Sequence, residues 1–571
     1  MLAAGLPKDG PLSSPVARTR LREAGMVDRE GWGGTVMEQQ RRTWWSRLRN
    51  GRMRGHPGAA SAILCLLALG VAGNISWAAA NRSGGTLVFV RSADANFLDA
   101  GFTTITEDLD VAVNVFDYLV QMDKTGAIKP GLAVSWQNVQ GRTWTFTLRT
   151  DAKFHDGTPV DAEAVAFSLN RLDPDSPYYV KGRTSSFRIW LGNLLVQAEA
   201  VDARTVRVTL REPYALFPQM LASFAVPIVS PAAAKRLGDG FARQPVGSGP
   251  FRFVEWVKDD HITVATNPDY WGGAPNLDQV IFKVVPDASS RLLELKRGSG
   301  QFLKGILPDQ RAAIEGDKSL ALLTLPCSCI GYLAINDQKK PFDNVLVRRA
   351  LNYAIDRETI MRTIEGGLGI VAEGMLPSWM PGYNAQAPKY PYNPARAKEL
   401  LLQAGFPTGF STQLWTFNVE RPFIPNVLQV AEKVRADLAQ VGVDAKMSVL
   451  DSAVYWRSIN TLQGELAMKG WYTPPQPDFL IRVALLGLES ATHYPNTPHG
   501  QKLREMAAQA AQTFDAAERG RVYQQIQQLY MEDVPIVPLM HPAYAWVHNA
   551  AYTGVEISAD GLTRFQTVRR K

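Results

Sequence analysis

Hydrophobic and polar residues alternate in several short segments of the N-terminal half, which is the pattern of half-buried strands. Residues 86–90 are largely apolar, and residues 143–148 place tryptophan, phenylalanine and leucine on one face. Residues 205–210 repeat this alternation, and residues 262–285 hold two further strand candidates around a turn at 267–273. The many turn residues between these segments predict a region of mixed α and β structure.

The pattern changes near residue 330, where helical and strand-like segments begin to alternate. One continuous helix is predicted from Asn344 to about residue 366, and Asn393 followed by Pro394 marks the start of another. Further strands are predicted at 411–417, 444–450, 465–471 and 536–541, and further helices at 426–441 and 515–532. Such alternation predicts an α/β lobe.

An uncharged segment at residues 55–81 has the features of a secretory signal. Arginines precede its apolar centre, and the small residues 78–80 follow it. This order predicts a signal peptide at 37–80 that is cleaved after Ala80, and it leaves residues 1–36 as an upstream extension. A membrane anchor is the alternative, but two glycines and an asparagine shorten the apolar part below the roughly 20 residues that a span needs.

The chain has 571 residues and a formal net charge of +7. The first 55 residues hold eleven basic and five acidic residues, so nearly all of the excess positive charge lies in the leader. The remainder is close to neutral, and a basic surface for nucleic acid is not expected. The hydrophobic fraction of 46% is that of ordinary globular domains.

The sequence contains no motif of a hydrolase, a zinc enzyme or a phosphate-binding loop. None of its seven histidines has the His-Glu-x-x-His spacing, and Gly247-Ser248-Gly249 lacks the spacing of a nucleophile elbow. His155 and Asp156 lie among turn residues, so a turn explains them better than a proton relay does. We therefore expect a protein that is not an enzyme and that has no cofactor and no metal site.

Cys327 and Cys329 are the two cysteines that remain after the predicted cleavage. In an oxidising compartment they could form a disulfide, or they could contact a soft metal ion. They could also be two small apolar residues, which is the interpretation that we favour because no other cysteine or histidine cluster is adjacent in sequence. Disulfides are therefore not expected to hold the fold together.

Four aromatic residues and one arginine lie at the ends of predicted strands or just after them. In open α/β sheets the carboxyl ends of strands are where ligands bind. Core packing is the alternative for the aromatic residues. Burial of the arginine without an anion would be costly, so it is either solvated or an anion ligand. The candidates for a ligand site are Trp415, Arg421, Phe423, Trp471 and Tyr472.

Several longer motifs resemble the bacterial extracellular solute-binding proteins of the peptide/nickel class, also called family 5. They occur in the order of that family and cover roughly residues 84–571. The motifs are PGLAVSW at 130–136, KFHDGTPVDAEAVAFSL at 153–169, PVGSGPF at 245–251, NPDYWGG at 267–273, PDA at 286–288 and VRRALNYAID at 347–356.

The resemblance implies a two-lobed α/β periplasmic-binding-protein fold, of the Venus-flytrap type, with an extended first lobe and two crossings between the lobes. The crossings would fall near residues 330–336 and 534–539. Lobe one would then comprise residues 84–332 and 537–571, and lobe two would comprise residues 333–536.

Within the family, the residues around Trp415 and Arg421 are most similar to the dipeptide-binding proteins. The resemblance gives Arg421 the role of holding a peptide carboxylate, and it adds Thr473 and Pro474 to the ligand-binding residues. Dipeptide-binding proteins carry an aspartate for the peptide amine at the position of Pro474, and a proline cannot supply that charge. An ordinary zwitterionic dipeptide is therefore not expected, unless Asp478 or another acid replaces the missing partner.

The predicted function is that of a monomeric periplasmic receptor for a peptide-like or other small anionic solute. Its partners would be the permease and the ATPase of an ABC importer, with no nucleic acid. The alternatives are an exported enzyme built on the same bilobed fold, and a sensor or chaperone that never meets an importer. The absence of a catalytic constellation argues against the enzyme.

Overall fold

The computed structural model describes residues 84–571 apart from residues 124, 224–225, 420, 461–462 and 488–491. The predicted upstream extension and signal peptide lie outside the described residues. Within the described part, no helix is both long enough and apolar enough to cross a membrane. The described residues also contain no cluster of three or more histidine, cysteine or acidic side chains that could hold a metal ion.

The strands predicted in the N-terminal half are confirmed. Their alternating apolar residues form one buried face, as in β5 (Thr143–Leu148), where Trp144, Phe146 and Leu148 are buried. An antiparallel sheet has the order β4 (Ala133–Val139), β5, β7 (Thr205–Leu210) and β6 (Leu195–Asp202). A second group of strands comprises β1 (Thr86–Arg91), β8 (Phe251–Val257), β9 (His261–Thr266), β10 (Gln279–Val284) and β11 (Phe302–Lys304).

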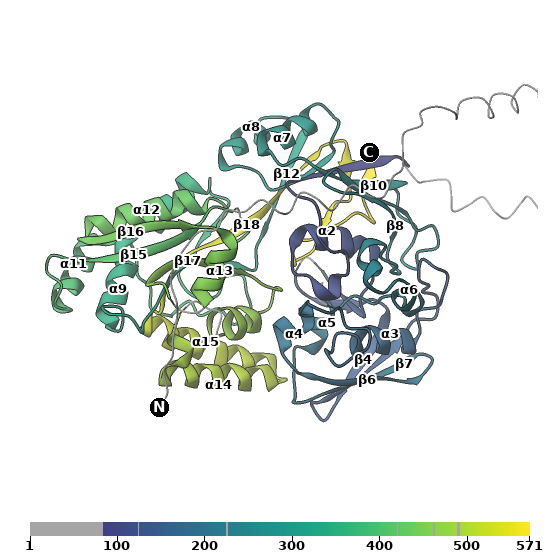
Figure 1. The fold of residues 1–571 in the computed structure, drawn as a ribbon, viewed down its shortest axis with the longest axis horizontal. Helices are drawn as coiled ribbons and strands as arrows, with labels where there is room; N and C mark the ends of the chain where they lie inside the picture. Colours follow the sequence, from purple (N-terminus) through teal and green to yellow (C-terminus); the bar gives the residue numbers. More distant parts are fainter. Residues whose placement is uncertain (1–83, 124, 224–225, 420, 461–462, 488–491) are drawn as a thin grey trace, which may run out of the picture. The chain divides into compact units, whose positions relative to one another are not determined.

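The predicted α/β alternation after residue 330 is also confirmed. Three parallel strands lie side by side: β16 (Val443–Leu450), β15 (Phe410–Phe417) and β17 (Leu466–Tyr472). Figure 1 shows helices packed beside these strands. They are α9 (Val345–Ala354), α11 (Pro394–Gln403), α12 (Val427–Gln440) and α13 (Ser452–Asn460).

The prediction of one continuous helix from Asn344 to about residue 366 is wrong. The helix α9 begins after the capping side chain of Asn344 but ends at Ala354, because Ile355 is extended. The Asp356 carboxylate then accepts hydrogen bonds from the amide (3.0 Å) and the hydroxyl (2.7 Å) of Thr359 and caps a new helical segment. The cap at Asp356 therefore starts a separate helical segment, although the apolar residues continue with helical spacing through this region.

The remaining helices complete the described chain. The predicted helix at 515–532 is α15 (Ala516–Asp533), and it packs against α14 (Pro498–Gln512), which the hydrophobic pattern did not reveal. The others are α2 (Thr106–Val115), α3 (Ala162–Asn170), α4 (Ser186–Leu191), α5 (Phe217–Leu221), α6 (Pro231–Leu237), α7 (Ala288–Lys296), α8 (Arg311–Glu315) and α10 (Arg357–Thr359).

The strand predicted at 536–541 is part of a longer strand, β18 (Ile536–Asn549), which changes its partners along its length (Figure 1). Its first half pairs with β13 (Cys329–Ile335) and β14 (Gly369–Val371), whereas its second half pairs with β11 and β12 (Leu320–Pro326). Because β18 pairs with both groups, the strands around β15 and the strands around β1 belong to one continuous hydrogen-bonded sheet.

Several of the family-like motifs meet at the buried carboxylate of Asp117. It accepts hydrogen bonds from Ser248 (3.0 Å), Tyr270 (2.9 Å) and the indole of Trp271 (2.8 Å). A side chain on Gly247 would overlap the carbonyl of Val115, two residues before Asp117. The PVGSGPF turn can therefore approach this segment so closely only because it carries glycine there. These motifs therefore hold the fold rather than a ligand.

Burial raises the pKa of Asp117 to about 6, against about 3.9 in an unfolded chain. Between these two values the folded protein binds a proton that the unfolded chain releases, so the free energy of unfolding should fall as the pH rises from 4 to 6. Asp117→Asn lacks this titration. We expect urea unfolding at pH 4, 5, 6 and 7 to show that wild type loses about 2 kcal/mol relative to the variant and then levels off. A difference that stays constant over this range would contradict the assignment.

Candidate functional site

A cavity of about 520 Å³ lies among segments that are far apart in the sequence. Its wall includes the N-terminal turn of α2, the end of β11, the loop before α12, the end of β17 and the second half of β18. The side chains of its wall include Glu107, Asp110, Trp190, Lys304, Arg421, Phe423, Trp456, Lys469, Trp471, Tyr472 and Tyr544.

The structure brings four of the seven predicted site residues to this cavity and leaves three outside its lining. Arg421, Phe423, Trp471 and Tyr472 line it. Trp415 lies elsewhere, with its indole nitrogen donating to the side chain of Gln413 (3.2 Å). Thr473 and Pro474 directly follow the lining residues of β17 and are buried behind them.

Two facing glycines make room for the loop that carries Arg421. Gly331 on β13 and Gly470 on β17 are partners across the strand pair. A side chain on Gly331 would overlap the carbonyl of Phe423, and one on Gly470 would overlap the Phe423 ring. The space left by the two absent side chains lets Phe423 pack directly against the strands, and this packing places Arg421 at the cavity.

Arg421 is half-buried and reaches the cavity from a short backbone turn. The amide of Ile424 donates to the carbonyl of Arg421 (3.1 Å), which closes this turn. Among the described residues, the Arg421 guanidinium makes no hydrogen bond or ion pair. Its five donors are thus available to an anion, and a planar carboxylate fits their geometry.

A second cation of the cavity wall was not singled out from the sequence. Lys469 is buried, and its ammonium lies 4.7 Å from the ring centre of Trp456 and 5.2 Å from that of Trp471. The two indole faces attract this charge and keep it near the cavity. Only its position just before Gly470-Trp471 could have identified it in the sequence.

Among the acids that line the cavity, Asp110 and Glu107 differ in their surroundings. Asp110 is buried and holds Lys304, whose ammonium lies 3.0 Å from both carboxylate oxygens. Burial raises the pKa of Asp110, and the charge of Lys304 acts in the opposite direction. The carboxylate of Glu107 is half-buried and makes no hydrogen bond or ion pair within the described part of the chain.

Asp478, the acid considered as a replacement for the missing amine partner, is occupied elsewhere. It is fully buried and accepts hydrogen bonds from Arg482 (2.9 Å), Tyr214 (3.0 Å) and Tyr523 (3.5 Å). It does not line the cavity. In this arrangement its charge is balanced by Arg482 rather than by a group in the cavity.

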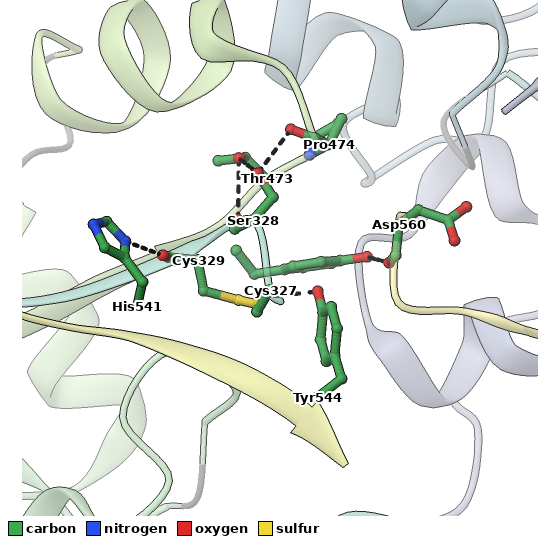
Figure 2. Close-up of a disulfide and its surroundings, with 9 residues drawn as sticks. Cys327, Ser328, Cys329, Thr473, Pro474, His541, Tyr544 and Asp560 are labelled. Atoms are coloured by element: carbon green, nitrogen blue, oxygen red, sulfur yellow. Dashed lines mark hydrogen bonds between the residues drawn. A yellow bond between two sulfur atoms is a disulfide. The ribbon is translucent and has the colours of Figure 1, made fainter. Parts of the chain in front are cut away.

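The interpretation of Cys327 and Cys329 as two unlinked apolar residues is wrong, because the structure joins them in a disulfide (Figure 2). They are buried between β12 and β13, next to the end of β17. Spacing alone could not distinguish a bond from two packed thiols, since the turn that brings both sulfur atoms together depends on the surrounding strands.

Comparison with known proteins gives consistent matches over most of the chain. Residues 127–487 match the model of bacterial extracellular solute-binding proteins, family 5 (middle part). The dipeptide-binding protein of Escherichia coli K12 is 31% identical over 528 residues, which cover 88% of this chain and 98% of that protein. The glutathione-binding protein GsiB of the same strain is 32% identical over 511 residues, or 87% and 96% of the two chains.

A solved structure matches to a similar extent. The periplasmic binding protein DppA of Helicobacter pylori, in complex with the peptide STSA, has a TM-score of 0.74 and 30% identity. The match covers 86% of this chain and 98% of that one. These similar proteins are named as binding proteins rather than as enzymes.

Proposed function

The chain belongs to family 5 of the bacterial extracellular solute-binding proteins, and from this premise we propose that it captures a small carboxylate-bearing solute for an ABC importer. Its fold is the two-lobed α/β fold of that family. The observation that carries the proposal is the guanidinium of Arg421, which lines an aromatic cavity with all of its donors unused among the described residues. The solute is delivered in the periplasm to the permease and its ATPase.

The capture step is closure of two lobes, with residues 84–332 and 537–571 in one and residues 333–536 in the other. The change of partners along β18 supports a pivot there, because Pro326 pairs opposite Ala543 while Gly331 pairs opposite Met540. A solute favours the closed form only through contacts that the open form lacks. Lys304 belongs to the first of these lobes and Arg421 to the second, and both line the same cavity.

The solute is peptide-like, and its amine, if it has one, is masked. The dipeptide-binding and glutathione-binding relatives support a peptide-like ligand. Pro474 stands where the dipeptide-binding pattern has an aspartate, and Asp478 is held by Arg482. An ammonium group that loses its water without gaining a carboxylate partner is unfavourable.

The proposed function is tested on residues 81–571 purified from an exporting host. Mass spectrometry of the denatured protein identifies the small molecules that co-purify with it, and a thermal-shift panel then ranks peptides, acylated peptides and organic acids. A carboxylate-bearing solute that raises the unfolding temperature supports the proposal. A bound solute without any anionic group would contradict it.

The role of Arg421 gives a quantitative prediction. Arg421→Ala should weaken binding of the carboxylate solute by about 2–5 kcal/mol, as when one side of a buried charge pair is removed. Arg421→Lys should restore only part of this affinity, because the two-pronged geometry is lost. Calorimetry measures both variants, with Arg396→Ala as the matched control because Arg396 is exposed and pairs with Glu399 on α11, away from the cavity. Unchanged affinity in a folded Arg421→Ala protein would remove Arg421 from the site.

The missing amine partner gives a second prediction. We expect N-acetylated peptides to bind more tightly than the same peptides with a free amine, since only the latter must desolvate an ammonium group. Calorimetry on matched pairs measures the difference.

A tenfold preference for the free amine would contradict this expectation and would indicate that an acid of the cavity wall pairs with the amine. Glu107 is then the residue to test, because its carboxylate has no partner among the described residues. Glu107→Gln should abolish the preference in that case. Glu163→Gln is the matched control, since Glu163 also lies in the first turn of a helix, α3, but is exposed and outside the cavity.

A further inference from the structure

The Cys327–Cys329 disulfide lies where the chain passes from β12 to β13, opposite the point where β18 changes partners. The amide of Cys327 donates to the carbonyl of Pro542 (3.1 Å), and Nδ1 of His541 donates to the carbonyl of Cys329 (2.8 Å). Both cysteines are almost completely buried, at 1% and 0% exposure. The disulfide-bonded turn is therefore attached to β18 at two adjacent residues, within the short stretch where β18 changes partners.

The same turn also holds the segment that follows β17. The amide of Thr473 donates to the carbonyl of Ser328 (3.0 Å), and the hydroxyls of these two residues lie 3.1 Å apart. The Ser328 hydroxyl also donates to the carbonyl of Pro474 (3.2 Å). Figure 2 shows the Cys-Ser-Cys turn between these partners, so three separate segments of the chain meet at it.

The disulfide is in contact with the cavity wall through two tyrosines. The sulfur of Cys329 lies 3.9 Å from the hydroxyl of Tyr544. The rings of Tyr544 and Tyr472 are 6.2 Å apart and almost perpendicular, and the Tyr472 hydroxyl donates to the carbonyl of Asp560 (2.6 Å). Both tyrosines line the cavity. A change at the sulfur atoms would thus reach the cavity wall at Tyr544, and Tyr472 through the ring of Tyr544.

We propose that the Cys327–Cys329 disulfide is a positioning element of the binding site: it fixes the turn that ties three segments together and so places Tyr472 and Tyr544. A disulfide stabilises a fold mainly by lowering the conformational entropy of the unfolded chain, and this effect is smallest for the shortest loops. A bond across one intervening residue has little such effect, so its influence is local. The inference does not depend on which solute binds.

Hydrogen–deuterium exchange of the solute-free protein tests the proposal. Wild type is compared with Cys327→Ala/Cys329→Ala, which keeps small apolar groups but removes the bond. Amides in residues 326–331, 472–476 and 541–545 should exchange at least tenfold faster in the variant. Amides of β5 and β7, in a separate sheet, should exchange at the wild-type rate, and the midpoint of chemical unfolding should stay nearly unchanged.

Two results would overturn the proposal: exchange at the wild-type rate around the turn, or acceleration by a similar factor everywhere, which would mean a general loss of stability. Wild-type protein prepared with both thiols reduced, and checked by mass after alkylation of the unfolded chain, provides a second measurement. It must show the same local acceleration. If both the variant and the reduced protein are unfolded, the bond serves the whole fold and the inference fails.

Discussion

The backbone hydrogen bonds of β18 are the constraint on which the rest of the structure depends. Buried amide and carbonyl groups must be hydrogen-bonded. A strand can therefore pair with two different groups of strands only if the second group begins to pair with it where the first group ends. In β18 this exchange occurs within a few residues, between the pairings of Met540 and Ala543. The carbonyl of Pro542 is paired at this point by the amide of Cys327. The disulfide turn is bonded to His541 and Pro542 at this exchange, the residues that follow on β18 line the cavity, and the end of β17 pairs with β13 next to the same turn.

The family-like motifs and the ligand site draw on different residues. The PVGSGPF and NPDYWGG motifs converge on Asp117, where buried donors are satisfied by one carboxylate and glycines permit close backbone approach. They maintain the scaffold, so they predict the fold well and say little about the solute. The residues that line the cavity come from many separate segments of the chain, and the residues of the Asp117 cluster are not among them. The cavity wall can therefore change without disturbing that cluster.

Much of the fold could be predicted from the sequence because period-2 alternation and helix caps are local signals. The prediction failed where two local signals competed, as at Asp356, whose cap ends the apolar period of α9. For the site, the resemblance and the strand ends identified Arg421 and three aromatic residues of the cavity wall. Glu107 on α2 and Tyr544 on β18 could not be found in this way, because the tertiary fold brings these distant segments to the cavity. The bond between Cys327 and Cys329 depends on the tertiary fold in the same way.

The facing glycines behind Phe423 have a consequence for how this receptor can diversify. Gly331 and Gly470 set the depth at which the Arg421 loop sits, and any larger residue at either position would push the whole loop outward. Arg421 itself is half-buried and Pro422 is exposed, so neither is confined by packing in the same way. A substitution of Arg421 would therefore leave this close packing of Phe423 intact, whereas a substitution of either glycine would displace the loop together with whatever side chain it carries. The placement of the loop and the chemistry of its side chains can thus be altered independently.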